Sequence, residues 1–331
     1  MQLLARGQRP RDNHIMDIRL ATFNLENLEW AAGRQADFAA RRAALLPLLT
    51  ALDADVLCLQ EVGAQKPHKH APRAYLGLDH LLAGTPYEAF ERAASVRPGS
   101  GAPADVHNLV ILSRWPIRAS RQIHHDLVER WSWRPPREDA ARPETVVVEW
   151  DRPLLYAAIE PPHGALLHVL NLHLRAPRPA PVATARGEGS SKSQAEGQFV
   201  AAQKREGQAL EARLFIETLF DAEPDAHIAV CGDFNADEFD VPTRLLRGGD
   251  NELQQGARAL TPLEDHVDPA RRYTVLHAGK PKLIDHILAS RALAGACSDA
   301  RILNVGLEDE VFAQEPILGS LHAPMIVTLS L

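Results

Sequence analysis

The sequence predicts a protein of the α/β (α+β) class that folds as one domain. Apolar runs typical of buried strands alternate with helical stretches in the first third of the chain, and strands dominate the rest. Polar residues directly follow many of these runs, as at the rim of a layered α/β protein. No linker divides the 331 residues into self-sufficient halves, and this length suffices for one large domain.

The first expected element is a strand over residues 17–23, where polar and apolar side chains alternate. A helix is expected over 35–52, with a kink or break at Pro47, which cannot donate a backbone hydrogen bond. A buried strand should follow over 55–60 and end at Glu61. The next predicted strands are 109–112 and 146–150, and the irregular segments around them are 63–107 and 128–143.

The second half begins with an expected strand over 165–174. Residues 176–198 are rich in Pro, Gly, Ser and Ala, which predicts a flexible insertion. An amphipathic helix is expected over 199–220, and the last predicted strands are 227–231, 284–289, 301–305 and 324–330. Residues 1–16 lack regular patterning and predict a disordered tail before a domain over 17–331.

Composition narrows the classes of function. The net charge of −7 disfavours a nucleic-acid substrate, since such proteins usually present a basic surface to phosphates, although a local basic groove would be compatible with it. The three cysteines form no disulfide framework or zinc motif, and no apolar run is long enough to span a bilayer. Residues 1–13 contain no secretory signal. We expect a monomer in the cytoplasm.

The candidate site residues are the polar groups at strand ends. Carboxylate and amide oxygens suit Mg²⁺ or Mn²⁺ rather than zinc, and histidines add proton transfer or charge stabilisation. Together these groups favour phosphoryl chemistry. The residues in question are Asn24, Glu61, Asn171, His173, Asp233, Asn235, Asp285 and His322.

Six short motifs occur in order along nearly the whole domain. They are Thr22-Phe23-Asn24-Leu25-Glu26-Asn27-Leu28, Leu59-Gln60-Glu61-Val62, Asn171-Leu172-His173-Leu174, Gly232-Asp233-Phe234-Asn235, Ile284-Asp285-His286-Ile287 and His322-Ala323-Pro324. The set resembles the endonuclease/exonuclease/phosphatase superfamily, to which pancreatic-type deoxyribonuclease belongs. This resemblance implies a four-layer sandwich: two central mixed β-sheets packed face to face and flanked by helices.

The resemblance also implies roles. Glu61 matches the principal metal-binding glutamate, and Asn24 matches the asparagine that supports the metal or its water. Asp233 matches the aspartate that orients or deprotonates the attacking water, and Asn235 matches the amide that steadies the phosphate oxygens. Taken alone, Gly-Asp-Phe-Asn would equally suit a tight turn, so the other motifs decide the interpretation.

The histidines complete the implied site. His173 matches the residue that contacts the phosphate and protonates the leaving oxygen. Asn171 lies two residues earlier, on the same face of an extended strand, and is therefore a candidate substrate-binding residue. His322 matches the terminal catalytic histidine, and Asp285 matches the aspartate that fixes its tautomer. His286 should point to the opposite face and is expected to be structural.

One residue departs from the family pattern. The family usually has Ser-Asp-His before the last strand, whereas this chain has Ser320-Leu321-His322. Either the metal is held by fewer protein ligands and more water, or a nearby group substitutes for the missing carboxylate, or activity is reduced. The leading hypothesis is metal-dependent hydrolysis of phosphate esters by a phosphodiesterase or phosphatase, with nuclease activity as one form of it. The alternative is a non-catalytic binding module on the same scaffold.

Overall fold

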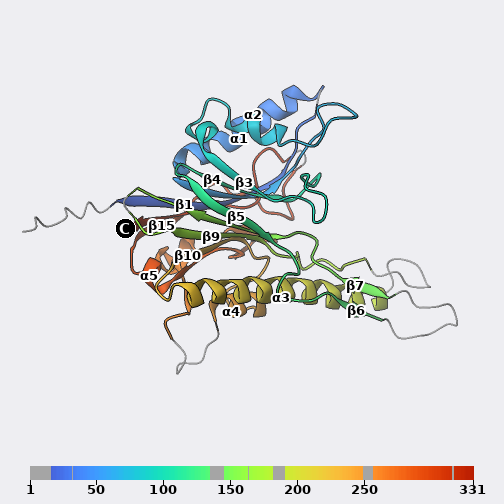
Figure 1. The fold of residues 1–331 in the computed structure, drawn as a ribbon. Coiled ribbons are helices and arrows are strands. Elements are labelled where there is room, and N and C mark those ends of the chain that lie inside the picture. The colour runs from blue at the N-terminus through green and yellow to red at the C-terminus, as the bar shows by residue number, and fades with distance from the viewer. Residues whose placement is uncertain are drawn as a thin grey trace, which may run out of the picture.

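The computed structural model describes residues 16–31, 33–134, 145–162, 164–181, 191–248, 256–314 and 317–331. Two six-stranded sheets pack face to face, and helices cover the outer face of each sheet (Figure 1). The predicted four-layer α/β sandwich is therefore confirmed. Residues 1–15 of the expected tail and 182–190 of the expected insertion lie outside the described residues.

The first sheet contains the two chain ends of the described domain. Its order is β15 (Cys297–Ile302), β16 (Met325–Ser330), β1 (Asp17–Leu28), β2 (Val56–Val62), β4 (Asn108–Ser113) and β3 (Glu91–Ala94). β1 and β2 are parallel, while the other neighbours are antiparallel. The ends of β1 and β2 therefore lie at the same edge as the start of β4.

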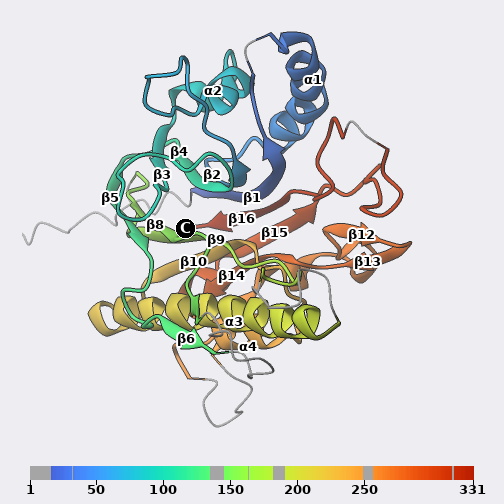
Figure 2. The ribbon, with the colours of Figure 1, turned by 90° about the vertical axis from the view of Figure 1, so that its right-hand side faces the viewer.

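The second sheet repeats this mixed pattern. Its order is β11 (Leu260–Pro262), β14 (Asp285–Ser290), β10 (His227–Asp233), β9 (Leu167–His173), β8 (Leu154–Ile159) and β5 (Ile117–Ile123), and β9 and β10 are its parallel pair. Two further antiparallel pairs lie outside the two sheets, one seen in Figure 2 and the other in Figure 1. They are β12 (Val275–His277) with β13 (Lys280–Lys282), and β6 (Trp131–Trp133) with β7 (Val146–Val148).

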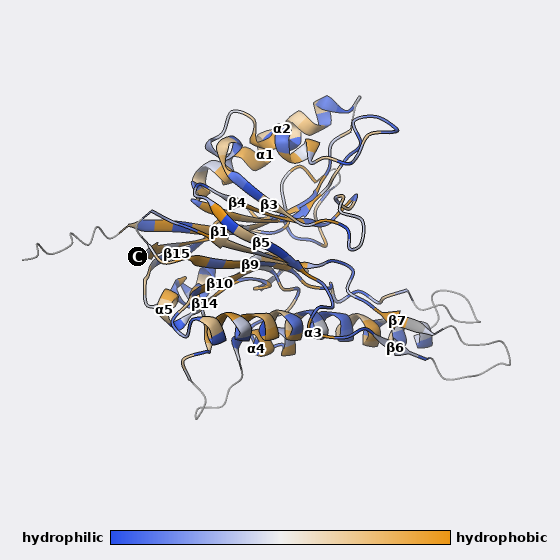
Figure 3. Cartoon of the chain, viewed as in Figure 1, coloured by the Kyte–Doolittle hydropathy of each residue, from blue (hydrophilic) through white to orange (hydrophobic). Residues whose placement is uncertain are grey.

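Helices form the outer layers because each buries one apolar stripe. α1 (Gln35–Leu52) and α2 (Leu76–Leu82) pack on the first sheet, and α3 (Ser191–Ala222) and α4 (Val241–Arg247) pack on the second. Hydrophilic and hydrophobic positions alternate along these helices (Figure 3). The shorter helices are α5 (Arg291–Ala294), η1 (Pro86–Ala89), η3 (Leu263–His266) and η4 (Pro269–Arg271).

The central core lies between the sheets. Aliphatic side chains of both inner faces meet there, such as Ile18 and Val56 from the first sheet and Val169 and Ile287 from the second, all fully buried. Cys58 and Cys231 are buried in the same layer as small apolar groups and form no disulfide. Because this core is continuous, the two sheets hold their edges at a fixed separation.

Several elements differ from the sequence prediction. α1 continues through Pro47 without a break, since buried leucines on both sides of the proline pack the helix against the sheet. α3 begins at Ser191, inside the segment expected to be an insertion. The predicted irregular segments contain α2, β3 and β6, and the unpredicted β5 and β8 complete the second sheet. β5 is an edge strand with an exposed middle, so it lacks the apolar pattern of a core strand.

Candidate active site

A β-bulge turns Glu61 out of the first sheet. Register partners Leu59–Val110 and Val62–Asn108 show one extra residue in β2 relative to β4, and Glu61 has a φ of +57°. Positive φ is uncommon for such a residue and is concentrated at functional sites. The Glu61 side chain is 14% exposed, and the backbone N–H of Asn27 donates to its Oε2 at 2.9 Å.

Asn24 joins carboxylates of the two sheets. Its Nδ2 lies 3.1 Å from Asp233 Oδ2 and 3.5 Å from Glu61 Oε1, while its Oδ1 accepts from the backbone N–H of Glu26. The amide nitrogen, as placed, therefore faces both acids, and the amide oxygen is occupied by the backbone. This geometry suits an amide that holds Glu61 and Asp233 together.

The end of β10 requires a glycine before its aspartate. Gly232 has a φ of +135°, and a Cβ there would lie 1.9 Å from the carbonyl oxygen of Leu172. The following Asp233 is 2% exposed. Its Oδ1 accepts from the backbone N–H of Asn235 at 2.8 Å, and its Oδ2 accepts from Asn235 Nδ2 at 3.2 Å. Burial first, and then the charge of Asp285, raise the pKa of Asp233 from 3.8 to about 7.

The side-chain amide hydrogens of Asn235 are used in hydrogen bonds within the protein. Its Nδ2 donates to the carbonyl oxygen of Leu174 at 3.1 Å as well as to Asp233, so both amide hydrogens have acceptors within the chain. The implied role of steadying phosphate oxygens has no free donor to support it. The arrangement instead suits a residue that fixes the orientation of the Asp233 carboxylate.

Asp285 and His322 form a buried pair. Asp285 Oδ2 lies 2.9 Å from His322 Nδ1, and the residues are 2% and 7% exposed. Burial disfavours the imidazolium, but the carboxylates of Asp285, Asp233 and Glu26 outweigh burial and raise the pKa of His322 well above its ordinary value. Asp285 Oδ1 is buried without a hydrogen-bond partner among the described residues, and a carboxylate oxygen of Asp285 lies within 4.8 Å of ligand atoms of Asp233 and His322.

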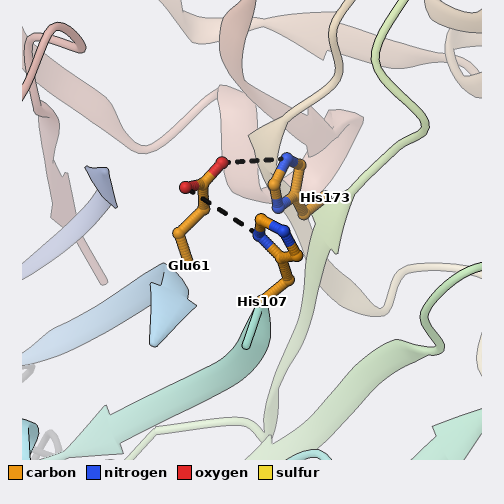
Figure 4. A group of neighbouring side chains, drawn as sticks. All are labelled: Glu61, His107 and His173. Carbon is orange, nitrogen blue, oxygen red and sulfur yellow. Dashed lines mark ion pairs between the residues drawn. The ribbon is translucent and has the colours of Figure 1, made fainter. Parts of the chain in front are cut away.

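His173 ends β9 between the two acids. Its Nε2 lies 3.4 Å from Asp233 Oδ2 and 3.7 Å from Glu61 Oε1 (Figure 4). Burial, followed by the positive charge of Arg152, lowers the pKa of His173 well below its ordinary value. His173 is therefore neutral at physiological pH, which suits a hydrogen-bond donor better than an acid that protonates the leaving oxygen.

Two residues of this cluster were not predicted from the sequence. His107 precedes β4 and has a φ of +58°, and its Nδ1 lies 3.9 Å from Glu61 Oε2 (Figure 4). Arg152 precedes β8, and its guanidinium contacts the His173 ring. Both stand before antiparallel strands. A search for polar groups after strands misses such residues, and only strand pairing places them at the same edge.

Asn171 does not join the cluster. It shares a face of β9 with His173, as predicted, but lies one pleat deeper and is 0% exposed. Its Nδ2 donates to the carbonyl oxygens of Leu59 and Val110, and its Oδ1 accepts from Gln60 Nε2 at 2.7 Å. Every polar atom of the amide is used to join the two sheets, so the geometry gives Asn171 a structural role rather than one in substrate binding.

The remaining predicted positions are accounted for. His286 is fully buried and bonds Glu264 Oε1 at 2.6 Å and the carbonyl oxygen of Ala236 at 2.9 Å, in keeping with a structural residue. Gln208 of α3 is buried as well. Leu321 is 6% exposed and supplies no ligand atom.

The site has donors that fit a divalent cation. The carboxylates of Glu61, Asp233 and Asp285 are hard oxygen donors, and the unpartnered Asp285 Oδ1 is an acceptor of the kind a metal or its water would satisfy. A cavity of about 720 Å³ is lined in part by Glu26, Asn27, Arg41 and Leu318, and Glu61 is not among its lining residues. The cluster thus combines metal donors and a buried dyad.

Comparison with known proteins identifies the family. The model of the Endonuclease/Exonuclease/phosphatase family matches residues 21–307. The chain belongs to this family. Family members are phosphoesterase hydrolases that generally use a divalent metal. The comparison with curated proteins found no match.

Solved structures of this family share the fold. A family protein from Bacteroides thetaiotaomicron is 16% identical with a TM-score of 0.59, and 95% of each chain is covered. A mannosyl-6-phosphatase from the same organism is 15% identical with a TM-score of 0.58, covering 95% of this chain and all of the other. The 3′ phosphatase NExo from Neisseria, bound to a product DNA hairpin, is 17% identical with a TM-score of 0.52 at 95% and 100% coverage.

No helix in the described residues combines the length and apolar character that crossing a membrane requires.

Proposed function

We propose that the protein hydrolyses phosphate esters with the help of Mg²⁺ or Mn²⁺. The observation that carries the proposal is the meeting of Glu61 from the first sheet with Asp233 from the second, joined by the Asn24 amide and flanked by the Asp285–His322 pair. Seven of the eight residues predicted from sequence belong to this cluster. A scaffold without catalytic function would have no need to keep such a set of buried acids together, because their mutual repulsion destabilises the fold.

Glu61, with the Asn24 amide beside it, would hold the metal. When bound, a divalent ion neutralises charge on the phosphate and favours ionisation of water. Because Leu321 offers no carboxylate, Glu61 would carry more of the binding than in relatives with an aspartate at this position. The donor set therefore supports cation binding with several water ligands.

Asp233 would position the attacking water and accept its proton. Asn235 and Asn24 hold the carboxylate by 2.8, 3.1 and 3.2 Å hydrogen bonds, so its orientation is fixed before the substrate arrives. The pKa of about 7 lies near physiological pH, which suits a group that accepts a proton during the reaction. The attack forms the bond from the water oxygen to phosphorus and breaks the bond to the leaving oxygen.

His322 and His173 would stabilise the phosphate from the protein side. Asp285 holds Nδ1 of His322, which leaves the other ring nitrogen of a charged imidazolium for the substrate. Neutral His173 can donate a hydrogen bond to a phosphate oxygen from Nε2. Since the pKa of His322 is raised and that of His173 is lowered, His322 is the better candidate for protonating the leaving oxygen.

The substrate is either the phosphate ester of a small organic molecule or a nucleic acid. The net charge of −7 favours the small phosphate ester. We further propose that the protein works as a monomer in a reducing compartment such as the cytoplasm, in keeping with its three free cysteines.

A turnover assay tests the proposal. Purified protein should hydrolyse bis(p-nitrophenyl) phosphate or p-nitrophenyl phosphate with Mg²⁺ or Mn²⁺, and EDTA should abolish this. Asp233→Asn should reduce kcat/KM by about 10³-fold or more. Asp225→Asn, at the exposed turn before the opposite end of β10, should leave it unchanged. Activity that survives both EDTA and Asp233→Asn would overturn the mechanism, and a complete lack of turnover would favour the binding-module alternative.

A further inference from the structure

Arg152 places a guanidinium inside the candidate site. The residue lies two positions before β8 and is only 8% exposed. β8 runs antiparallel to β9, so its start lies beside the end of β9. Nη1 of Arg152 contacts Nδ1 of His173 and lies 2.9 Å from Nε2 of the same ring. The guanidinium therefore reaches the residue that itself lies between Glu61 and Asp233.

The charge of Arg152 has no direct counter-ion. Among the described residues no carboxylate forms an ion pair with it, and its side chain makes polar contacts only with the His173 ring. The adjacent Asp151 turns away and pairs with Arg175 at 3.2 Å and Lys204 at 2.8 Å. Burial lowers the pKa of Arg152, whereas the fields of Glu61, Asp151 and Asp233 raise it.

An unpaired buried guanidinium is costly for a fold. A charge removed from water destabilises a protein unless another group compensates it, and a distant carboxylate compensates only in part. The five N–H donors of arginine form a planar fork that matches carboxylate and phosphate oxygens. Because one edge of the fork meets His173, the remaining donors are left for a group that enters the site.

The rest of the chain holds Arg152 in place. Gln208 of α3 is 1% exposed, and its Nε2 donates to the carbonyl oxygen of Arg152 at 3.2 Å. Its Oε1 accepts from the backbone N–H of Arg175 at 2.9 Å. One buried amide thus fixes the backbone at both residues that bring positive side chains to this edge. The backbone of Arg152 is thus held by Gln208, while the polar contacts of its guanidinium among the described residues are with His173.

We propose that Arg152 is a further catalytic residue whose guanidinium binds a non-bridging oxygen of the substrate phosphate and stabilises the charge on it during attack. The inference rests on the proposed function and extends it. Water oxygen bonds to phosphorus, the bond to the leaving oxygen breaks and its electron pair departs with that oxygen, and the proton from water passes to Asp233. Arg152 keeps its own proton throughout and acts by charge and hydrogen bonding.

The test compares Arg152→Ala and Arg152→Lys with the wild type. With Mn²⁺ present, Arg152→Ala should lower kcat/KM for bis(p-nitrophenyl) phosphate by about 10²- to 10³-fold. Arg152→Lys should lose about tenfold or more, since an ammonium cannot reproduce the planar fork. Low, non-denaturing guanidinium should restore part of the activity of Arg152→Ala. Inorganic phosphate should stabilise the wild type against heat more than either variant, which gives a readout independent of turnover.

Arg213→Lys is the matched control. Arg213 lies on α3 and bonds the carbonyl oxygens of Leu246 at 3.2 Å and Arg258 at 3.0 Å, so its role is structural. This variant should keep kcat/KM within about threefold and should not respond to guanidinium. If Arg152→Ala does not fold, Arg152→Lys decides, because it keeps the charge and most of the stem.

The outcomes separate the two proposals. A wild type without turnover overturns the proposed function itself. An active wild type whose folded Arg152 variants retain kcat/KM within about threefold, with unchanged stabilisation by phosphate, overturns the role of Arg152 and leaves the proposed function intact.

Discussion

Asp233→Asn should make the metal-free protein more stable at alkaline pH. The Asp233 carboxylate is 2% exposed and shares a cluster with Asp285, and its pKa is raised from 3.8 to about 7. Because the folded-state pKa exceeds the unfolded value, the folded protein holds a proton that the unfolded chain releases. The stability contributed by this group is therefore complete below a pH of about 3.8 and is lost as the pH rises through about 7.

The size of the effect follows from the two pKa values. The difference between about 7 and 3.8 corresponds to about 4 kcal/mol when the carboxylate is fully ionised, of which about 3 kcal/mol falls between about pH 5 and about pH 8.5. Asparagine removes this charge but adds a donor opposite Asn24 and Asn235, which costs about 1–2 kcal/mol at every pH. We expect the two proteins to be about equally stable near pH 5, and the variant to be the more stable one by about 2–3 kcal/mol near pH 8.5.

Urea unfolding in EDTA at several pH values measures the effect. The free energy of unfolding of the wild type should fall relative to Asp233→Asn as the pH rises, whereas the exposed control Asp225→Asn should run parallel to the wild type. Added Mg²⁺ should stabilise the wild type more than Asp233→Asn, because binding to the folded state alone adds stability. Parallel curves for wild type and Asp233→Asn in EDTA would refute the raised pKa of Asp233.

Three further predictions concern single positions. Gly232→Ala should lower the free energy of unfolding in urea by about 3 kcal/mol or more, since its Cβ would meet the Leu172 carbonyl at 1.9 Å. Gly279→Ala, with a φ of +75° and open space around it, should lower it by only about 1 kcal/mol. Equal losses would contradict the steric argument. Asn171→Ala should lose about 2–4 kcal/mol of stability by leaving buried groups unpaired, yet the folded protein should keep kcat/KM within about threefold; a larger drop would restore a substrate-binding role. Leu321→Asp should tighten Mn²⁺ binding by about tenfold in calorimetry, while Asp at the 82% exposed Val305 should not; an unchanged affinity would show that residue 321 does not face the metal.

The fold could be predicted because the motifs are ordered and local. Many of the apolar runs end in polar residues whose identity matches the family, so the layers and the strands that carry the site follow from sequence. β5 could not be predicted in this way, because an exposed edge strand has no alternating pattern. The start of α3 could not be predicted for a related reason. The first turns of this helix are polar and contain glycine, and helical periodicity appears only where the helix meets the sheet.

The site was predictable at strand ends and less so elsewhere. Glu61, Asp233 and His173 lie at strand ends; parallel pairing places Asp233 beside His173, and the facing sheet brings Glu61 to them. His107 and Arg152 begin antiparallel strands, so their proximity depends on pairing that the sequence does not reveal. Asn171 shows what the two-residue period of a strand cannot predict. The period places Asn171 on the same face of the strand as His173, but a step of about 6.6 Å along the strand moves it from the rim into the interior.

The role of Glu61 offers the most direct test of a metal-dependent phosphoesterase. The measurement is kcat/KM for bis(p-nitrophenyl) phosphate as a function of Mn²⁺ concentration, in wild type and Glu61→Gln, with the exposed Glu223→Gln as the matched control. The wild type and Glu223→Gln should show saturable, metal-dependent turnover, and Glu61→Gln should lose about 10²-fold or more. Turnover by Glu61→Gln equal to that of the wild type at every Mn²⁺ concentration would contradict the account.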